Sequence, residues 1–162
     1  MNNKKYIRSS RRTMIKSLFA TVLTAGMGAF RLAQGEPAKR SRKEASAEAV
    51  PFGNQPLISQ YTTHGDFVFV KGMGDHEERD ISKATNNVLD MIEEQLDAAG
   101  SSMEKALKVT VFLRNIRDYD AMNQAYRGRF GDRPPARTTV ACYNGIPGGS
   151  LLEIDCIAAK IE

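Results

Sequence analysis

The sequence has few residues that bind metals or carry redox chemistry. Only two cysteines and two histidines occur among its 162 residues, and none has the CxxC or Cys/His spacing of a metal site. Cys142 and Cys156 either pair as a disulfide or stay unpaired in strands, where a thiol packs as a small apolar group. His64 and His76 fall in a turn and an acidic loop, where a solvated side chain is the default. A metal centre is therefore not indicated.

Motifs of several large enzyme classes are also missing. The chain has no P-loop, no dinucleotide-binding fingerprint and no Gly-x-Ser-x-Gly nucleophile elbow. These absences argue against nucleotide hydrolysis, nicotinamide chemistry and serine hydrolysis of the α/β type.

Acidic residues are absent from positions 1–35. Seven of the 23 Lys and Arg residues lie there, which leaves 16 basic against 19 acidic residues in the rest of the chain, a net charge of −3. The overall positive charge thus belongs to the N-terminal segment. A basic surface for nucleic acid is not indicated for the folded part.

The N-terminal segment is typical of an export signal. A basic stretch precedes an uncharged run from Leu18 to Phe30 that is too short to span a bilayer comfortably as a helix. Residues 10–16, Ser-Arg-Arg-Thr-Met-Ile-Lys, resemble the twin-arginine export motif. We expect residues 1–35 to use the twin-arginine machinery and to be cleaved near Gly35, leaving a periplasmic protein. The alternatives are a disordered basic tail and an uncleaved membrane anchor.

Residues 36–50 are polar and lack a periodic apolar face, which predicts a linker. Residues 51–162 are then one domain, since 41% of the residues are hydrophobic, enough for one ordinary core.

The first half of this domain predicts a hairpin and a helix. Residues 58–63 and 67–70 are strand-like and flank a turn at Gly65. Ser82 is a candidate N-cap of a helix that ends before Gly100. Its apolar residues recur at spacings of three and four: Thr85, Val88, Ile92, Leu96 and Ala99.

The second half predicts a strand, a helix and two more strands. Residues 107–113 alternate as in a half-buried strand. Asp118 can cap a helix whose face includes Met122, Tyr126 and Phe130, more typical of a core than of a ligand site. The final strands are 138–143 and 151–158. The order ββ, α, β, α, ββ predicts an α+β domain of two layers, with both helices on one face of a β-sheet.

Arg137 and Glu153 are the candidate functional pair. Arg137 follows two prolines and opens a strand, while Glu153 lies on the polar face of the last strand. A guanidinium matches a carboxylate in shape, and a glutamate can place a water and move its proton. From the residues alone, a surface ion pair is an equal alternative.

The run "RPPARTTVACYNGIPGGSLLEIDCIAAK" resembles the C-terminal signature of the RidA/YjgF family. "SQYTTHGDFVFVKG" and "AAGSSMEKALKVTVFLRNIRDYDAMNQAY" resemble the family's opening hairpin and its middle, in the same order. The resemblance covers about residues 56–160.

This resemblance implies a chorismate-mutase-like fold, a homotrimer with sites between subunits, and hydrolysis of enamines or imines such as 2-aminoacrylate to 2-oxo acids and ammonia. It implies no metal and no organic cofactor. Arg137 falls on the arginine that binds the substrate carboxylate and Glu153 on the acid that orients water. Thr139 falls on a position whose backbone contacts substrate. No nucleic acid is expected as a partner, and membrane contact is expected only through the signal.

Two departures affect the expected pocket. Ile58 stands where the family often has a tyrosine, and Lys71-Gly72-Met73 replaces its Ser-Gly-Gln segment before a short acidic loop. Ile58 and Gly72 remain candidate substrate-binding residues. The alternative function is a module of the same fold that binds small carboxylates or amino acids without turnover. RNA cleavage and a holdase role, both proposed for relatives, are further alternatives, and the acidic domain disfavours the former.

Overall fold

The computed structural model describes residues 43–46 and 49–161. The expected export signal, residues 1–35, lies outside the described residues, as does most of the expected linker. Two short strands nevertheless fall within residues 36–50 or begin there: β1 (Glu44–Ala45) and β2 (Ala49–Phe52). Each pairs through its backbone with a neighbouring strand, β1 with β4 and β2 with β3, so regular structure starts before residue 51.

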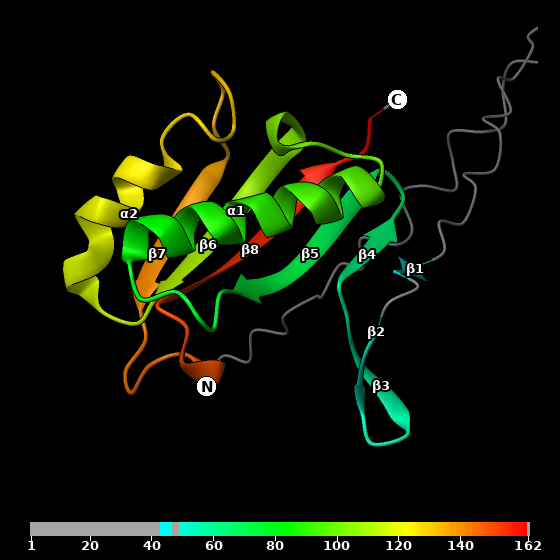
Figure 1. Ribbon diagram of the computed structural model, residues 1–162. Helices are drawn as coiled ribbons and strands as arrows, with labels where there is room; N and C mark the ends of the chain where they lie inside the picture. Colours follow the sequence, from blue (N-terminus) through cyan, green and yellow to red (C-terminus); the bar gives the residue numbers. More distant parts are fainter. Residues whose placement is uncertain (1–42, 47–48, 162) are drawn as a thin grey trace, which may run out of the picture. The chain divides into compact units, whose positions relative to one another are not determined.

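The main sheet has six strands in the order β1-β4-β5-β8-β6-β7 (Figure 1). All neighbours are antiparallel except β6 and β7, which run parallel. The bounds are Tyr61–His64 (β4), Phe67–Gly74 (β5), Ala106–Leu113 (β6), Ala136–Ala141 (β7) and Leu152–Ala159 (β8). The last two strands along the chain therefore do not pair with each other, because β6 lies between them.

The predicted hairpin is present, with somewhat different bounds. β4 and β5 pair from Tyr61↔Val70 to His64↔Phe67, and Gly65 in the turn has a φ of 59°, which glycine adopts without strain. Residues 58 and 59 belong instead to β3 (Gln55–Ser59), which pairs with β2 in a separate two-stranded sheet.

The first helix, α1, spans Ile81–Ala98, and its N-cap is Asp80 rather than Ser82. The Asp80 carboxylate accepts a hydrogen bond from the Lys83 N–H at 2.9 Å, as a capping side chain does. The apolar face is as expected, since Thr85, Val88, Ile92 and Leu96 are fully buried.

The second helix, α2, spans only Tyr119–Tyr126, so the prediction that it continues to Phe130 was wrong. Arg127 leaves the helical conformation with a ψ of 132°, and Gly128 has a φ of 78°, which no helix continues through. Asp118 is at the N-cap but makes no side-chain capping bond. Phe130 is still buried and packs with its ring centroid 5.0 Å from that of Tyr126.

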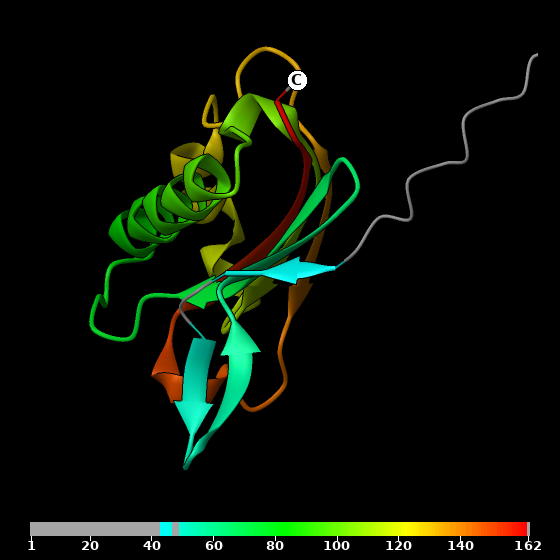
Figure 2. The same cartoon turned by 90° about the vertical axis from the view of Figure 1, so that its right-hand side faces the viewer.

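Both helices cover the same face of the sheet (Figure 2). Their apolar residues meet alternate strand residues in one core, among them Val68, Val109, Val111, Ile154 and Cys156. The α+β class with two helices on one face is thereby confirmed. Phe67, Phe69 and Val140 point the other way and are 47%, 41% and 42% exposed.

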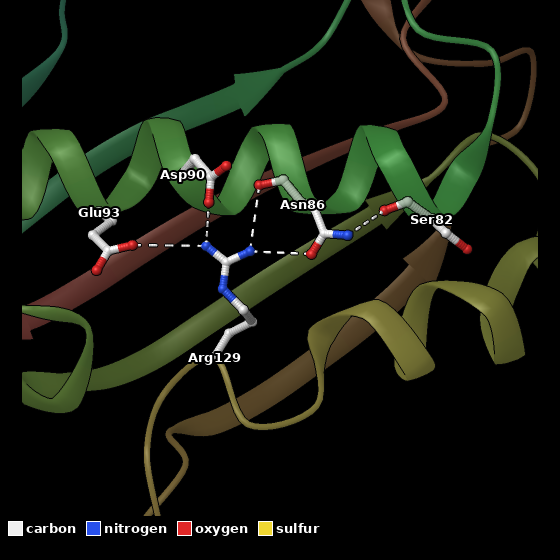
Figure 3. Close-up of polar contacts among 5 residues, drawn as sticks. All are labelled: Ser82, Asn86, Asp90, Glu93 and Arg129. Carbon is white, nitrogen blue, oxygen red and sulfur yellow. Dashed lines mark hydrogen bonds and ion pairs between the residues drawn. The ribbon is translucent and has the colours of Figure 1, made fainter.

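Arg129, in the turn after α2, ties that turn to α1 (Figure 3). Its guanidinium contacts Asp90 at 2.5 Å, the Asn86 side-chain oxygen at 3.1 Å and Glu93 at 3.7 Å. The next residue, Phe130, enters the core, and strand β7 with Arg137 begins six residues later. The cluster thus holds the segment that leads into β7.

Candidate functional site

Helix α2 positions the Arg137 side chain. Arg137 Nη2 donates a hydrogen bond to Asn123 Oδ1 at 2.6 Å, and its guanidinium carbon lies 4.7 Å from the Tyr126 ring centroid. Asn123 and Tyr126 are three residues apart and hence on one side of the helix. A second aromatic ring, that of Tyr119, lies 6.0 Å from the same carbon. The guanidinium is therefore held by one amide and two aromatic rings.

Arg137 lines a cavity of about 610 Å³, here called the Arg137 cavity. Its other lining residues are Asn123, Tyr126, Arg127, Gly128, Phe130, Gly131, Pro134 and Pro135. Across residues 43–46 and 49–161, no carboxylate lies within 4.0 Å of the Arg137 guanidinium. Because Asn123 occupies only part of the five-donor fork, the remaining donors can take an anion.

Tyr126 presents a neutral ring to Arg137. Its hydroxyl is buried and has no hydrogen-bond partner in the described part of the chain. Burial raises the pKa of Tyr126 to about 12, against the opposing effect of the Arg137 charge, and Cys156 adds to the rise. The phenol therefore stays protonated at ordinary pH and acts on Arg137 through its ring.

Glu153 lines a different cavity of about 620 Å³, here called the Glu153 cavity. Ile58 and Gly72, both expected near the substrate, line it too. The remaining lining residues are Lys71, Met73, Gly74, His76, Met91, Pro147 and Gly148. Three of the five candidate residues, Glu153, Ile58 and Gly72, thus line one cavity.

Gly72 makes room for the Glu153 side chain. The pairing of β5 with β8 shifts between Val70 and Met73, and this irregularity sets Gly72 beside the carboxylate. A β-carbon at Gly72 would lie 2.7 Å from the Glu153 Cδ and 3.0 Å from its Cγ, closer than van der Waals contact permits. Only glycine at this position allows the observed path of the Glu153 side chain.

His76, assigned from the sequence to a solvated loop, is exposed but held in place. Its Nδ1 lies 2.8 Å from the hydroxyl of the fully buried Ser150. A β-carbon at Gly148 would lie 2.5 Å from the same nitrogen, so this glycine admits the ring. Sequence reasoning missed His76 because its partner lies 74 residues away. Gly148 alone was a possible signal, because it is the residue that the ring approaches.

Arg137 and Glu153 do not share a cavity in one chain. Arg137 pairs with Val109 and Thr139 with Val111, and both valines are buried on the helix-covered face. Glu153 pairs with Phe112, on the opposite face, because strand residues alternate. Thr139 is half-buried and lines neither cavity. Arg137 and Thr139 thus lie on the helix-covered face of the main sheet and Glu153 on the other face, whereas Ile58 lines the Glu153 cavity from the separate two-stranded sheet.

The two cysteines are unpaired, Cys156 buried in β8 and Cys142 partly exposed just after β7. Burial raises the pKa of the Cys156 thiol to about 12, and the neighbouring Asp155 charge adds to the rise. In the described ranges, no group of three or more metal-binding side chains is close enough to hold an ion. The same residues include no helix of the length and apolarity that crossing a bilayer requires.

Comparison with known proteins shows several relatives. A RutC family protein of Pyrococcus horikoshii is 37% identical over 109 residues, 63% of this chain and 86% of that protein. A protein named Reactive Intermediate Deaminase A, chloroplastic, from Arabidopsis thaliana is 27% identical over 168 residues, 94% of this chain and 89% of that protein.

Among solved structures, a YjgF family member from Neisseria meningitidis superposes with a TM-score of 0.66 at 25% identity, covering 76% of this chain and 99% of that one. The family model described as Endoribonuclease L-PSP matches residues 54–160. That range contains both cavities and all five candidate residues. The chain therefore belongs to the endoribonuclease L-PSP family, the group also known as RidA/YjgF.

Proposed function

We propose that this protein hydrolyses enamines and imines of 2-amino acids to 2-oxo acids and ammonia. One observation carries the proposal: the Arg137 guanidinium is held by Asn123 and Tyr126 but has no carboxylate partner in the described chain. Such a cation is suited to the carboxylate that all 2-imino acids share. The relative named Reactive Intermediate Deaminase A supports the same reaction class.

The proposal requires a second copy of the chain, because Arg137 and Glu153 lie on opposite faces of one sheet. The Arg137 strand, β7, is one of the two edge strands of the described six-stranded sheet, so it is placed to approach another copy. The sheet face without helices exposes the apolar side chains of Phe67, Phe69 and Val140. Exposed apolar side chains that lie together are common where proteins associate. We propose a homotrimer in which Arg137 of one copy faces the Glu153 cavity of the next.

The chemistry of these groups is sufficient for the reaction. Arg137 would bind the substrate carboxylate and fix the position of the adjacent imine carbon. Glu153 would take a proton from water as the water oxygen bonds to that carbon, then return the proton to nitrogen. With the protonated imine as substrate, the nitrogen then leaves as ammonia with the electron pair of the C–N bond, while Glu153 takes the proton of the hydroxyl group. A 2-oxo acid remains.

The test is hydrolysis of imines made in solution by an amino-acid oxidase, with the surviving imine trapped by semicarbazide. The full chain should accelerate imine loss, whereas Arg137→Ala and Glu153→Gln should not. Arg117→Ala removes an exposed guanidinium and should leave the rate unchanged. Undiminished activity in Arg137→Ala would reject the assigned role.

Light scattering tests the assembly independently. A trimer mass is expected at micromolar concentration, and a monomer that still hydrolyses imines would reject the shared site. A trimer that binds 2-oxo acids without hydrolysing any imine would instead favour the carboxylate-binding module. The absence of a tyrosine hydroxyl at Ile58, which lines the Glu153 cavity, is the observation in favour of that alternative.

We also propose that the protein works in the periplasm after export through the twin-arginine machinery. The support is the Ser10 to Lys16 motif and the following apolar run. Replacing Arg11 and Arg12 together by lysine should leave the protein in the cytoplasmic fraction. Unchanged fractionation would overturn this assignment.

A further inference from the structure

The Glu153 cavity contains two basic side chains that the proposed reaction does not use. Lys71 and His76 line it together with Glu153. In a single copy its volume of about 620 Å³ is within the usual range for small-molecule sites. These two side chains, which can both donate hydrogen bonds to an anion, point to a substrate with a second acidic group.

Lys71 is available to bind an anion. Its backbone N–H donates to the Gln60 carbonyl at 3.0 Å, which fixes the start of the side chain next to Gly72. Although Lys71 and Glu153 line the same cavity, they form no ion pair, and no other carboxylate of the described residues lies within 4.0 Å of the Lys71 ammonium.

Two sets of hydrogen bonds hold His76 in place, one at its ring and one at the preceding residue. Ser150 holds its ring, as described above. The preceding residue, Asp75, accepts hydrogen bonds from the Asn87 side chain at 2.7 Å and from the N–H groups of Glu77 and Glu78. These bonds, that from Asn87 foremost, lower the pKa of Asp75, so the loop stays anchored to α1 as long as this carboxyl is ionised. The imidazole therefore has a defined place at the cavity wall.

Apolar side chains complete the wall. Met73 is buried, Met91 is partly buried, and Ile58 is exposed. Methylene groups of a substrate side chain would contact these residues, while its terminal group would meet Lys71 and His76. A cavity that combines apolar walls with a few placed polar groups selects ligands of matching pattern.

We infer that the site prefers 2-imino acids whose side chain ends in a second carboxylate, and that Lys71 and His76 bind that carboxylate. The inference rests on the proposed function and names the substrate class of the same site. Arg137 of a neighbouring copy would bind the first carboxylate, and Glu153 would lie between the two anionic ends, next to the imine carbon.

The experiment compares 2-iminoglutarate with 2-iminopentanoate, which has the same carbon chain without the second carboxylate. The ratio of kcat/KM for the two is measured for the full chain, Lys71→Met, His76→Asn and the control Lys105→Met, which changes an exposed lysine. We expect the wild-type ratio to favour the dicarboxylate and Lys71→Met to lower it roughly tenfold, the value of one modest charge contact. His76→Asn should lower the ratio less, and Lys105→Met should not change it.

A wild-type preference for 2-iminopentanoate would overturn the inference. A Lys71→Met variant that loses activity on both substrates equally, with an unchanged ratio, would also overturn it.

Binding of 2-oxoglutarate and 2-oxopentanoate, measured by calorimetry on the same variants, separates this inference from the proposed function. If neither imine is hydrolysed, the proposed function fails. Selective binding of the dicarboxylate that is lost in Lys71→Met would still support the inference, and equal binding of both acids would reject it.

Discussion

The α-carbon of Gly72 and the carboxyl group of Glu153 are so close that no β-carbon fits between them. They come from β5 and β8, and the irregular pairing between Val70 and Met73 creates the approach. The position of the candidate catalytic carboxylate thus depends on a residue with no side chain.

Gly72→Ala should displace the Glu153 side chain from its present rotamer, lower the free energy of unfolding by only about 0.5–1.5 kcal/mol because the clashing atoms belong to a flexible side chain, and abolish imine hydrolysis. Urea denaturation measures the change in the free energy of unfolding. In a Glu153→Ala background the same substitution should cost much less stability, because the clashing group is gone. If Gly72→Ala lowers the free energy of unfolding equally in both backgrounds, the contact between the added β-carbon and Glu153 is not the cause of the loss.

Arg137→Ala should weaken 2-oxo acid binding by about 2–5 kcal/mol if the contact is desolvated. Arg137→Lys should restore little of the lost affinity for 2-oxo acids, because an ammonium lacks the planar set of donors that Asn123 orients in Arg137. Asn123→Ala should cause a smaller loss, since the ring of Tyr126 still holds the cation. Calorimetry with 2-oxobutyrate measures all three, beside Arg117→Ala. Binding weakened as much in the control as in Arg137→Ala would contradict the prediction.

Tyr126→Phe should leave stability unchanged or raise it by about 1 kcal/mol, because the hydroxyl is buried without a partner in the described chain. The pKa of this phenol is raised from 10.0 to about 12, so its neutral form is favoured in the folded state. The contribution of this pKa shift to the free energy of unfolding is fully present below pH 10 and is lost as the pH rises from 10 towards 12. In a pH titration, phenolate absorbance should show one tyrosine with a pKa near 12, and this tyrosine should be absent in Tyr126→Phe. A clear loss of stability in Tyr126→Phe would indicate an unseen partner.

Only one thiol should react quickly with an alkylating reagent in the native protein. Cys142 is partly exposed, whereas Cys156 is buried with a pKa raised to about 12, so it offers almost no thiolate at neutral pH. Mass spectrometry of labelled protein should show one fast modification, lost in Cys142→Ser, and a second only in denaturant. Two fast modifications would contradict the burial of Cys156.

Arg129→Ala should lower the free energy of unfolding by about 1 kcal/mol, with a smaller loss at high salt, because the Asp90 and Glu93 partners are more than half exposed (Figure 3). Arg133→Ala, a nearby exposed arginine, is the matched control. If both variants lose the same stability, the cluster contributes nothing specific.

Much of the fold could be predicted from residue patterns, because those patterns are local. Spacings of three and four marked the buried face of α1, and alternation in residues 109–113 and 152–158 marked the buried sides of β6 and β8. Leu107, expected on the same side as Val109, is 48% exposed, because the pairing of β6 with β8 shifts between Ala106 and Lys108. Helix ends were less predictable. Asp80 and Ser82 are both good caps, and only the direction of the chain before α1 decides between them.

The candidate site was only half predictable, for a physical reason. The sequence by itself determined which residues carry the chemistry, that two prolines lead into the strand of Arg137, and which side of its own strand each residue occupies. Strand order, the parallel pairing of β6 with β7 and the irregularity at Gly72 depend on contacts between distant segments. Only the tertiary structure could therefore decide that Arg137 and Glu153 face opposite sides of the sheet and that His76 lines the same cavity as Glu153. Alternation relates neighbours along one strand, whereas the relation between strands follows from how the whole core packs.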